Sequence, residues 1–199
     1  MAVKDHRKPS FKPSKSQYWF LVTSFVLFGV VAGAYAGMQP MNAWRFFSWH
    51  PFLMTLGAVT LPGIAAVTKK MNGYTNTKLH GISNWLGIMC MGAGYYIIWK
   101  NKENNGAPHL TTNHGLVGMF VLLSMVGIGM VGGVLLHPDF GLDKQNPTIR
   151  TVHKYAGRVL LTTAWFTTIL GLYTLIPNDY IKLMAYAAPL VCMLPYSLM

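Results

Sequence analysis

Stretches without charged residues alternate with short charged segments along almost the whole chain. Six stretches of 17 to 23 residues contain no Asp, Glu, Lys or Arg: 19–37, 46–68, 79–99, 114–136, 159–178 and 183–199. A bilayer core is about 30 Å thick, and about 20 apolar residues in a helix cross it. The stretches do not alternate between apolar and polar residues, as half-buried strands would. We therefore predict an all-α membrane protein with six transmembrane helices.

Composition agrees with a membrane location. The chain of 199 residues is 52% hydrophobic and 11% charged, whereas a soluble domain has roughly 25% charged residues. The formal net charge is nevertheless +11, from 16 Lys and Arg against 5 Asp and Glu. A nucleic-acid-binding protein needs such cations on one exposed face, and six membrane helices leave no soluble face to carry them. We therefore expect membrane lipid, and not nucleic acid, as a partner.

The cations lie mostly on one side of the predicted helices. With the N-terminus in the cytosol, twelve Lys and Arg lie inside and four lie outside, which follows the positive-inside rule. We divide the chain into a basic cytosolic tail, 1–17, and a membrane domain, 18–199. The tail has no apolar core, so we expect no cleavable signal peptide. An endomembrane, a vesicle or the plasma membrane is favoured, and an organelle inner membrane stays open.

Four histidines fall on four consecutive predicted helices, at His50, His80, His114 and His153. Because successive helices run in opposite directions, His50 and His114 share the outer level, and His80 and His153 share the inner level. One membrane histidine alone is more often hydrogen-bonded to a neighbouring helix than a ligand. Two pairs at two depths instead indicate two bis-histidine haems inside a four-helix core made by the second to fifth helices.

Other sites fit the sequence less well. A zinc site needs three or four ligands in one place, and the topology separates the histidines into two pairs. All five acids lie in the tail or loops, and no phosphate-binding glycine loop or nucleophile elbow is present, so we expect no catalytic side chain. Gly118 and Gly157 each follow a candidate ligand by four residues. They are compatible both with a flat macrocycle close to the helix and with close packing of helices.

The sequence around these histidines resembles the eukaryotic cytochrome b561 family of ascorbate-dependent transmembrane reductases. The resemblance covers about 46–173, and the histidines are separated by 30, 34 and 39 residues, close to the family's pattern. Thr68-Lys69-Lys70 stands where some members have an arginine-rich stretch, so the chain is more similar to the short, ferric-reductase-type branch. The matching segments are Phe47-Ser48-Trp49-His50-Pro51, Leu79-His80-Gly81, Lys102-Glu103 through His109-Leu110 to His114-Gly115, and His153-x-x-x-Gly157.

The resemblance implies two haem b groups whose irons are the bound metals. His80 and His153 would hold the inner haem, and His50 and His114 the outer haem. It also implies a transmembrane ascorbate-dependent ferric reductase. Such an enzyme would pass electrons from cytosolic ascorbate to a ferric iron chelate or monodehydroascorbate on the other side.

The resemblance further directs attention to cations near the substrates. Ascorbate is an anion, and we expect Lys78, Arg150 and Lys154 to bind it at the inner face. His109 is the candidate for contact with the acceptor or a haem propionate at the outer face. A homodimer or a larger assembly is compatible with the sequence. The alternative function is a haem-binding or structural subunit of a larger membrane complex.

Overall fold

The computed structural model describes residues 11–199, so Lys4, Arg7 and Lys8 of the predicted tail lie outside the described residues. The described residues are mostly helical and contain no strand. The helical segments, of which η2 is 3-10 and η1, η3 and η4 are π-helical, are α1 (Lys15–Leu27), η1 (Phe28–Ala32), α2 (Gly33–Met38), η2 (Phe46–Ser48), α3 (Trp49–Thr55), η3 (Leu56–Thr60), α4 (Leu61–Lys70), α5 (Tyr74–Asn104), α6 (Asn113–Met130), η4 (Val131–Leu135), α7 (Pro147–Leu175) and α8 (Tyr180–Leu198).

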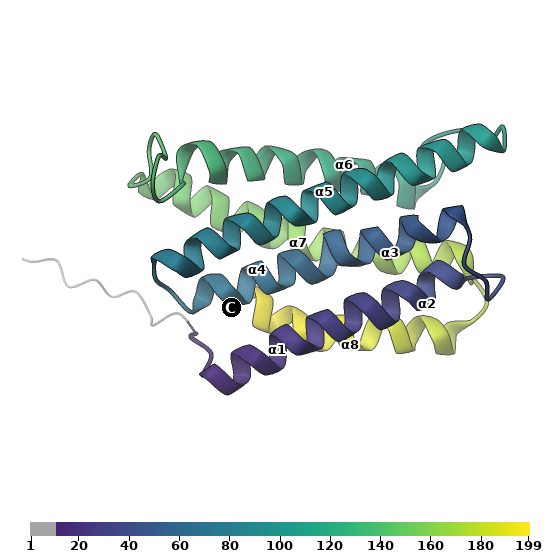
Figure 1. The fold of residues 1–199 in the computed structure, drawn as a ribbon, viewed down its shortest axis with the longest axis horizontal. Helices are drawn as coiled ribbons and strands as arrows, with labels where there is room; N and C mark the ends of the chain where they lie inside the picture. The colour runs from purple at the N-terminus through teal and green to yellow at the C-terminus, as the bar shows by residue number, and fades with distance from the viewer. Residues whose placement is uncertain (1–10) are drawn as a thin grey trace, which may run out of the picture.

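These segments join into six rods that run back and forth along one direction (Figure 1). The rods are α1–η1–α2, η2–α3–η3–α4, α5, α6–η4, α7 and α8. Five of them are long and apolar enough to cross a membrane. The 31-residue α5 completes the set by its length and by its place in the bundle. The predicted all-α membrane protein is therefore confirmed.

The two ends of the bundle differ in charge. We call the end with the connections 71–73 and 136–146 the inner end, and the end with the connections 39–45, 105–112 and 176–179 the outer end. Four of the described Lys and Arg lie toward the outer end, namely Arg45, Lys100, Lys102 and Lys182. The other nine lie toward the inner end. The described cations thus keep the asymmetry that the sequence predicts.

Several helices extend beyond the neutral stretches that predicted them. The third rod was predicted over 79–99, whereas α5 runs from Tyr74 to Asn104 and includes three lysines. Lysines near the ends of a membrane helix extend their long side chains toward water, so they need not end the helix. The first rod begins at Lys15, where the Ser14 side chain accepts a hydrogen bond from the Gln17 backbone N–H. This start lies slightly before the predicted boundary at residue 18.

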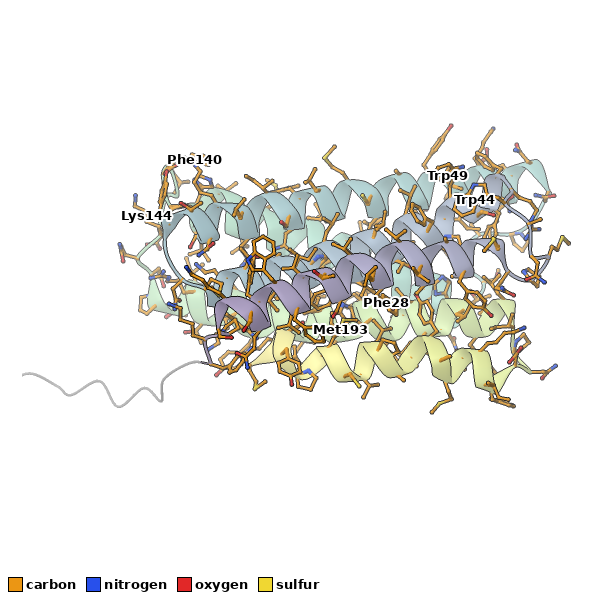
Figure 2. All side chains as sticks on the ribbon, turned by 60° about the horizontal axis from the view of Figure 1, so that its bottom comes forward. Phe28, Trp44, Trp49, Phe140, Lys144 and Met193 are labelled. Atoms are coloured by element: carbon orange, nitrogen blue, oxygen red, sulfur yellow. The ribbon has the colours of Figure 1, made fainter. Side chains whose placement is uncertain are left out.

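Four rods form the core of the bundle. α5 packs along α3 and α4 on one side and against α6 on the other, while α7 contacts α6 and α3. The first rod and α8 pack against this core, where Phe25 and Trp165 meet edge to face at 5.7 Å. Large apolar side chains project outward along the rods (Figure 2), including Phe20, Leu123 and Ile181. Such a surface suits contact with lipid.

The π-helical segment η3 brings the second rod unusually close to its neighbours. Thr60 Oγ1 donates a hydrogen bond to the Phe25 carbonyl oxygen at 3.2 Å, which links the second rod to the first. In η3, a Cβ on Gly57 would lie 2.6 Å from the Gly87 carbonyl oxygen of α5. π-helical turns change the register of a helix, and here the glycine at that turn allows the second and third rods to touch through their backbones.

Candidate functional site

The outer pair joins the second rod to the fourth. His50 lies in the first turn of α3 and His114 in the first turn of α6. Their ring centroids are 6.1 Å apart and the ring planes are inclined by 77°. His50 Nδ1 donates to the Gly94 carbonyl oxygen at 2.9 Å, and His114 Nδ1 donates to the Thr167 carbonyl oxygen at 3.0 Å. These bonds set the tautomer and leave both Nε2 atoms free to ligate.

The inner pair joins the third rod to the fifth. His80 lies near the start of α5 and His153 near the start of α7. Their ring centroids are 6.4 Å apart, with an interplanar angle of 73°. His80 Nδ1 donates to the Ala65 carbonyl oxygen at 2.9 Å. His153 Nδ1 is buried and has no hydrogen-bond partner among the described residues, so the two pairs are chemically unequal.

The spacing of each pair fits one metal ion between two imidazoles. An imidazole nitrogen binds a metal at about 2 Å, as the zinc–histidine distance illustrates. Two rings on opposite sides of the same ion then have centroids roughly 6 Å apart, given the size of an imidazole ring. The observed separations are 6.1 and 6.4 Å. Both pairs therefore fit axial ligation of a haem iron.

Glycines face the rings of two candidate ligands. A Cβ on Gly171 would lie 2.8 Å from His114 Cε1, and a Cβ on Gly132 would lie 3.1 Å from His153 Cε1. The sequence points to Gly118 and Gly157 instead. Gly118 lines the outer cavity, while a Cβ on Gly157 would make ordinary contact with Ile128 at 3.7 Å. Gly171 and Gly132 were missed because they lie on helices far along the chain from the rings they touch.

A cavity of about 250 Å³ opens beside the outer pair. Both outer histidines line it, together with Trp99, Lys102 and His109. The His109 ring stacks on the Trp99 ring at 3.8 Å, with an interplanar angle of 17°. The structure therefore brings the predicted acceptor residue His109 into the wall of the cavity that holds His50 and His114.

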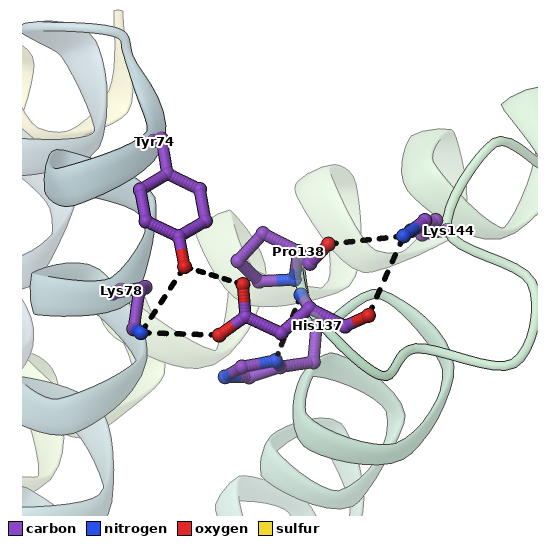
Figure 3. Close-up of polar contacts among 6 residues, drawn as sticks. Tyr74, Lys78, His137, Pro138 and Lys144 are labelled. Carbon is purple, nitrogen blue, oxygen red and sulfur yellow. Dashed lines mark hydrogen bonds and ion pairs between the residues drawn. The ribbon is translucent and has the colours of Figure 1, made fainter.

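The predicted donor residue Lys78 is already paired. Its Nζ lies 3.0 Å from a carboxylate oxygen of Asp139 and donates to the Tyr74 hydroxyl oxygen at 3.2 Å. The Tyr74 hydroxyl donates to Asp139 at 2.5 Å (Figure 3). The Tyr74 hydrogen bond, followed by that of Lys78, holds the pKa of Asp139 below its ordinary value. The connection 136–146 is thereby fastened to the start of α5.

Lys144 holds the same connection from its other side. Its Nζ donates to the carbonyl oxygens of Pro138 at 3.1 Å and Asp139 at 3.5 Å (Figure 3). His137 Nδ1 accepts a hydrogen bond from the Asp139 backbone N–H at 3.2 Å. The connection is therefore folded on itself, and the exposed Asp139 carboxylate pairs with Lys78.

Three other cations lie toward the inner end and differ from Lys78 in their contacts. Arg150 and Lys154 form no ion pair with a described acid, and Lys154 lies over the Tyr155 ring at 5.8 Å. Lys69 Nζ donates to the Thr77 hydroxyl oxygen at 2.6 Å, three residues before His80 on α5. Sequence reasoning counted Lys69 among the inner cations but did not single it out. Its position four residues after Ala65, whose carbonyl binds His80, places it on the same helix face.

Comparison with known proteins gives independent evidence for the family of this chain. The family model described as eukaryotic cytochrome b561 matches residues 49–177, which include all four histidines. Transmembrane reductase CYB561D2 of Mus musculus is 26% identical over 138 residues, which are 65% of this chain and 62% of that protein. Plasma membrane ascorbate-dependent reductase CYBRD1 of Rattus norvegicus is 23% identical over 131 residues, which are 63% and 46% of the two chains. The chain thus spans less than two thirds of these relatives.

Proposed function

Because the chain belongs to the eukaryotic cytochrome b561 family, we propose that it carries single electrons across a membrane through two bis-histidine b haems. Ascorbate at the inner end is the donor, and ferric iron or monodehydroascorbate at the outer end is the acceptor. The observation that carries this proposal is the pairing of histidines at opposite ends of one four-helix core, at 6.1 and 6.4 Å. The N-terminal side of the membrane is then the cytosol.

The residues around each pair suit electron transfer rather than chemistry on a bound substrate. A haem iron with two protein ligands has no open coordination position, so it exchanges electrons and does not readily bind O₂. His50, His80 and His114 are each oriented by a backbone carbonyl of a neighbouring rod. Such hydrogen bonds also increase the basicity of the ligand. The rods thus hold the rings in fixed positions while the charge on the iron changes.

The inner end suits an anionic donor. Lys69, Arg150 and Lys154 lie there and make no ion pair with a described acid. They provide the positive charge that an ascorbate anion or a haem propionate requires. Lys78 contributes to the same surface, but its pairing with Asp139 reduces the charge it offers. We therefore assign the main donor contacts to Lys69, Arg150 and Lys154, with Lys78 in a secondary role.

The outer end receives the acceptor near the outer pair. His109 lies on the cavity wall together with Lys102, whose Nζ donates to the Pro108 carbonyl oxygen at 2.7 Å. The bond holds the connection that carries His109. This arrangement supports a role for His109 at the exit of the electron path.

Difference spectra of the purified full chain test the proposal. We expect a b-type band near 560 nm after reduction with dithionite, and partial reduction with ascorbate, because two bis-histidine haems would be present. His80→Ala and His114→Ala should each remove about half of the haem, since each breaks one pair. His137→Gln is the matched control, because His137 lies in an inner connection outside both pairs. A wild-type protein without the band would refute the proposal.

A further inference from the structure

A second cavity, of about 500 Å³, opens at the outer end beside the one that holds the outer pair. Arg45, from the connection before the second rod, lines it together with Asn101 and Asn105 at the end of α5. Phe47 and Leu175 line both cavities. The Phe47 ring lies 5.8 Å from the His50 ring, centroid to centroid. One aromatic side chain therefore separates this second cavity from a candidate haem ligand.

The Arg45 side chain is anchored but not neutralised. One terminal nitrogen, Nη2, donates to the Gln39 carbonyl oxygen at 3.0 Å, and the other, Nη1, lies 3.2 Å from Met41 Sδ. The Nε atom is buried and has no hydrogen-bond partner among the described residues. No described carboxylate forms an ion pair with this guanidinium. A buried donor without a partner is costly, so an anion that accepts from Arg45 would stabilise this corner.

The two asparagines add neutral polar groups to the charge. Asn105 Nδ2 donates to the Asn101 carbonyl oxygen at 2.6 Å. The Asn101 side chain itself makes no hydrogen bond to a described residue, although it lines the cavity. A guanidinium beside the free Asn101 amide matches the oxygen atoms of a carboxylate. The nearest acid along α5, Glu103, is paired with Lys100 at 3.6 Å and accepts from Trp99 Nε1 at 3.2 Å.

We infer that this second cavity, lined by Arg45, Asn101 and Asn105, is the docking site for an anionic electron acceptor, namely a ferric chelate with carboxylate ligands. The inference rests on the proposed function and adds a site to it. One electron, supplied by the donor at the inner end, passes across the Phe47 side of the cavity to the chelated iron, so Fe(III) becomes Fe(II). No bond is made or broken, and no proton is transferred.

Binding of a redox-inert chelate tests the site without relying on turnover. Gallium(III) citrate resembles ferric citrate in charge and shape but accepts no electron. We expect Arg45→Gln to weaken its binding to the purified protein at least tenfold, because Arg45 is the only cation among the described residues that line the cavity. Arg45→Lys should give an intermediate affinity, since it keeps the charge but loses the fork of donors. Lys100→Gln is the matched control, because it removes an outer cation that does not line the cavity.

Reoxidation kinetics give a second readout. We expect Arg45→Gln to slow reoxidation of the pre-reduced protein by ferric citrate about tenfold, and to leave reoxidation by the cation hexaammineruthenium(III) within twofold of wild type. Asn101→Ala keeps Arg45 and its anchors, and it should weaken gallium citrate binding two- to fivefold. Asn101→Ala therefore tests the site even if Arg45→Gln fails to fold. Loss of the haem spectrum would reveal such a folding failure.

Three results would overturn the inference. Equal effects of Arg45→Gln and Lys100→Gln would mean that only the general surface potential matters. Unchanged gallium citrate affinity in a folded Arg45→Gln or Asn101→Ala protein would remove the site. Binding of ascorbate but not gallium citrate, lost in Arg45→Gln, would assign the cavity to an ascorbate-type anion instead. Because gallium citrate binding needs no electron transfer, it stays measurable if the proposed function fails in the spectral test.

Discussion

At the scale of single residues, the candidate ligands are positioned by atoms that belong to other helices. His50, His80 and His114 donate to carbonyls of Gly94, Ala65 and Thr167. None of these acceptors lies in the same rod as the ring it holds. Each ring is therefore oriented only after its rod has packed against a neighbour, which couples ligand geometry to assembly of the bundle.

The glycine that faces His114 provides a test at this scale. Gly171→Ala places a Cβ 2.8 Å from His114 Cε1, so the ring must move away from its carbonyl partner. We expect loss or spectral change of one haem and retention of the other, measured by haem content and by low-temperature spectra. Gly157→Ala is the control, since its Cβ would meet Ile128 at an ordinary 3.7 Å. Identical spectra for Gly171→Ala and wild type would contradict this role of the glycine.

The Asp139 cluster provides a test of pH dependence. The pKa of Asp139 is lowered by hydrogen bonds from Tyr74 and Lys78. Its contribution to stability is therefore fully present above the ordinary pKa of about 4 and is lost as the pH falls through the lower folded value. We expect thermal unfolding of wild type and Asp139→Asn to differ slightly at pH 6 and to coincide at pH 2 to 3. A difference that grows toward low pH would have the wrong sign.

The sequence could not predict which inner cations are free. Lys78 precedes a candidate ligand by two residues and carries the same charge as Lys69. The local sequence therefore favours Lys78 at least as strongly as Lys69 as a contact for the donor. The pairing with Asp139 joins residues 61 positions apart, and it depends on how the connection 136–146 folds. The contact of Lys69 with Thr77 likewise depends on how the second and third rods pack.

At the scale of whole elements, the bundle depends on a few places where backbones touch. Gly57 in η3 and Gly87 in α5 approach so closely that a Cβ on Gly57 would lie 2.6 Å from a carbonyl oxygen and 2.8 Å from the Met91 backbone nitrogen. Neither atom belongs to a flexible side chain, so the rods themselves would have to separate. This contact fixes the second rod, which carries His50, against the third, which carries His80.

Substitution at this contact should be strongly destabilising. We expect Gly57→Ala to lower the thermal stability of the detergent-solubilised protein and to reduce its haem content, because the two rods are forced apart. Gly92→Ala is the matched control within α5, since nothing lies within 4 Å of its added Cβ. There the gain in helix propensity of up to ~1 kcal/mol favours the alanine. Equal stability of the two variants would show that the second and third rods can move apart without loss of stability.

The six helices followed from the sequence because uncharged length alone specifies a membrane span. The pairing of histidines also followed, since helices that alternate in direction leave few arrangements. The π-helical turns were not predicted, and two of them, η1 and η3, meet across two rods, where a Cβ on Gly29 would clash with the Thr60 side chain. The extra turns of α5 were missed for a different reason, namely that Lys78, Lys100 and Lys102 are tolerated at helix ends.

At the scale of the whole molecule, the bundle has two chemically distinct ends. The inner end carries most of the described cations, and the outer end carries the two cavities beside His50 and His114. This asymmetry supports an orientation with the inner end in the cytosol. Under the proposed function, the orientation determines which side supplies the electrons.

Cysteine labelling tests the orientation. In a protein whose Cys90 and Cys192 are replaced by Ala, Ala107→Cys marks the outer end and Leu142→Cys marks the inner end. Leu142 is 79% exposed in the connection 136–146. We expect a membrane-impermeant maleimide to label residue 107 in intact cells or organelles, and residue 142 only after permeabilisation. The reverse pattern would exclude a cytosolic donor at the inner histidine pair.

The assembly state concerns the apolar surface of the bundle. Only 11% of an apolar 18-residue segment of the fourth rod is buried within the chain, which leaves surface for lipid, a haem, a second copy or another subunit. If the chain acts alone, we expect a monomer or dimer on native gels after mild detergent extraction. Migration with a larger complex, lost in stronger detergent, would favour the alternative role as a subunit.

The separation of the two histidine pairs has an electrical consequence. The stretches 79–99 and 114–136, which connect the two levels along α5 and α6, contain no acid, lysine or arginine, so neither helix offers such a group to carry a compensating proton. Under the proposed function, each transferred electron therefore moves net charge through the bilayer. One elementary charge that crosses the full membrane field exchanges ~2.3 kcal/mol per 100 mV. A cytosol-negative voltage would thus drive electrons outward, and the bundle would partly discharge the membrane as it worked.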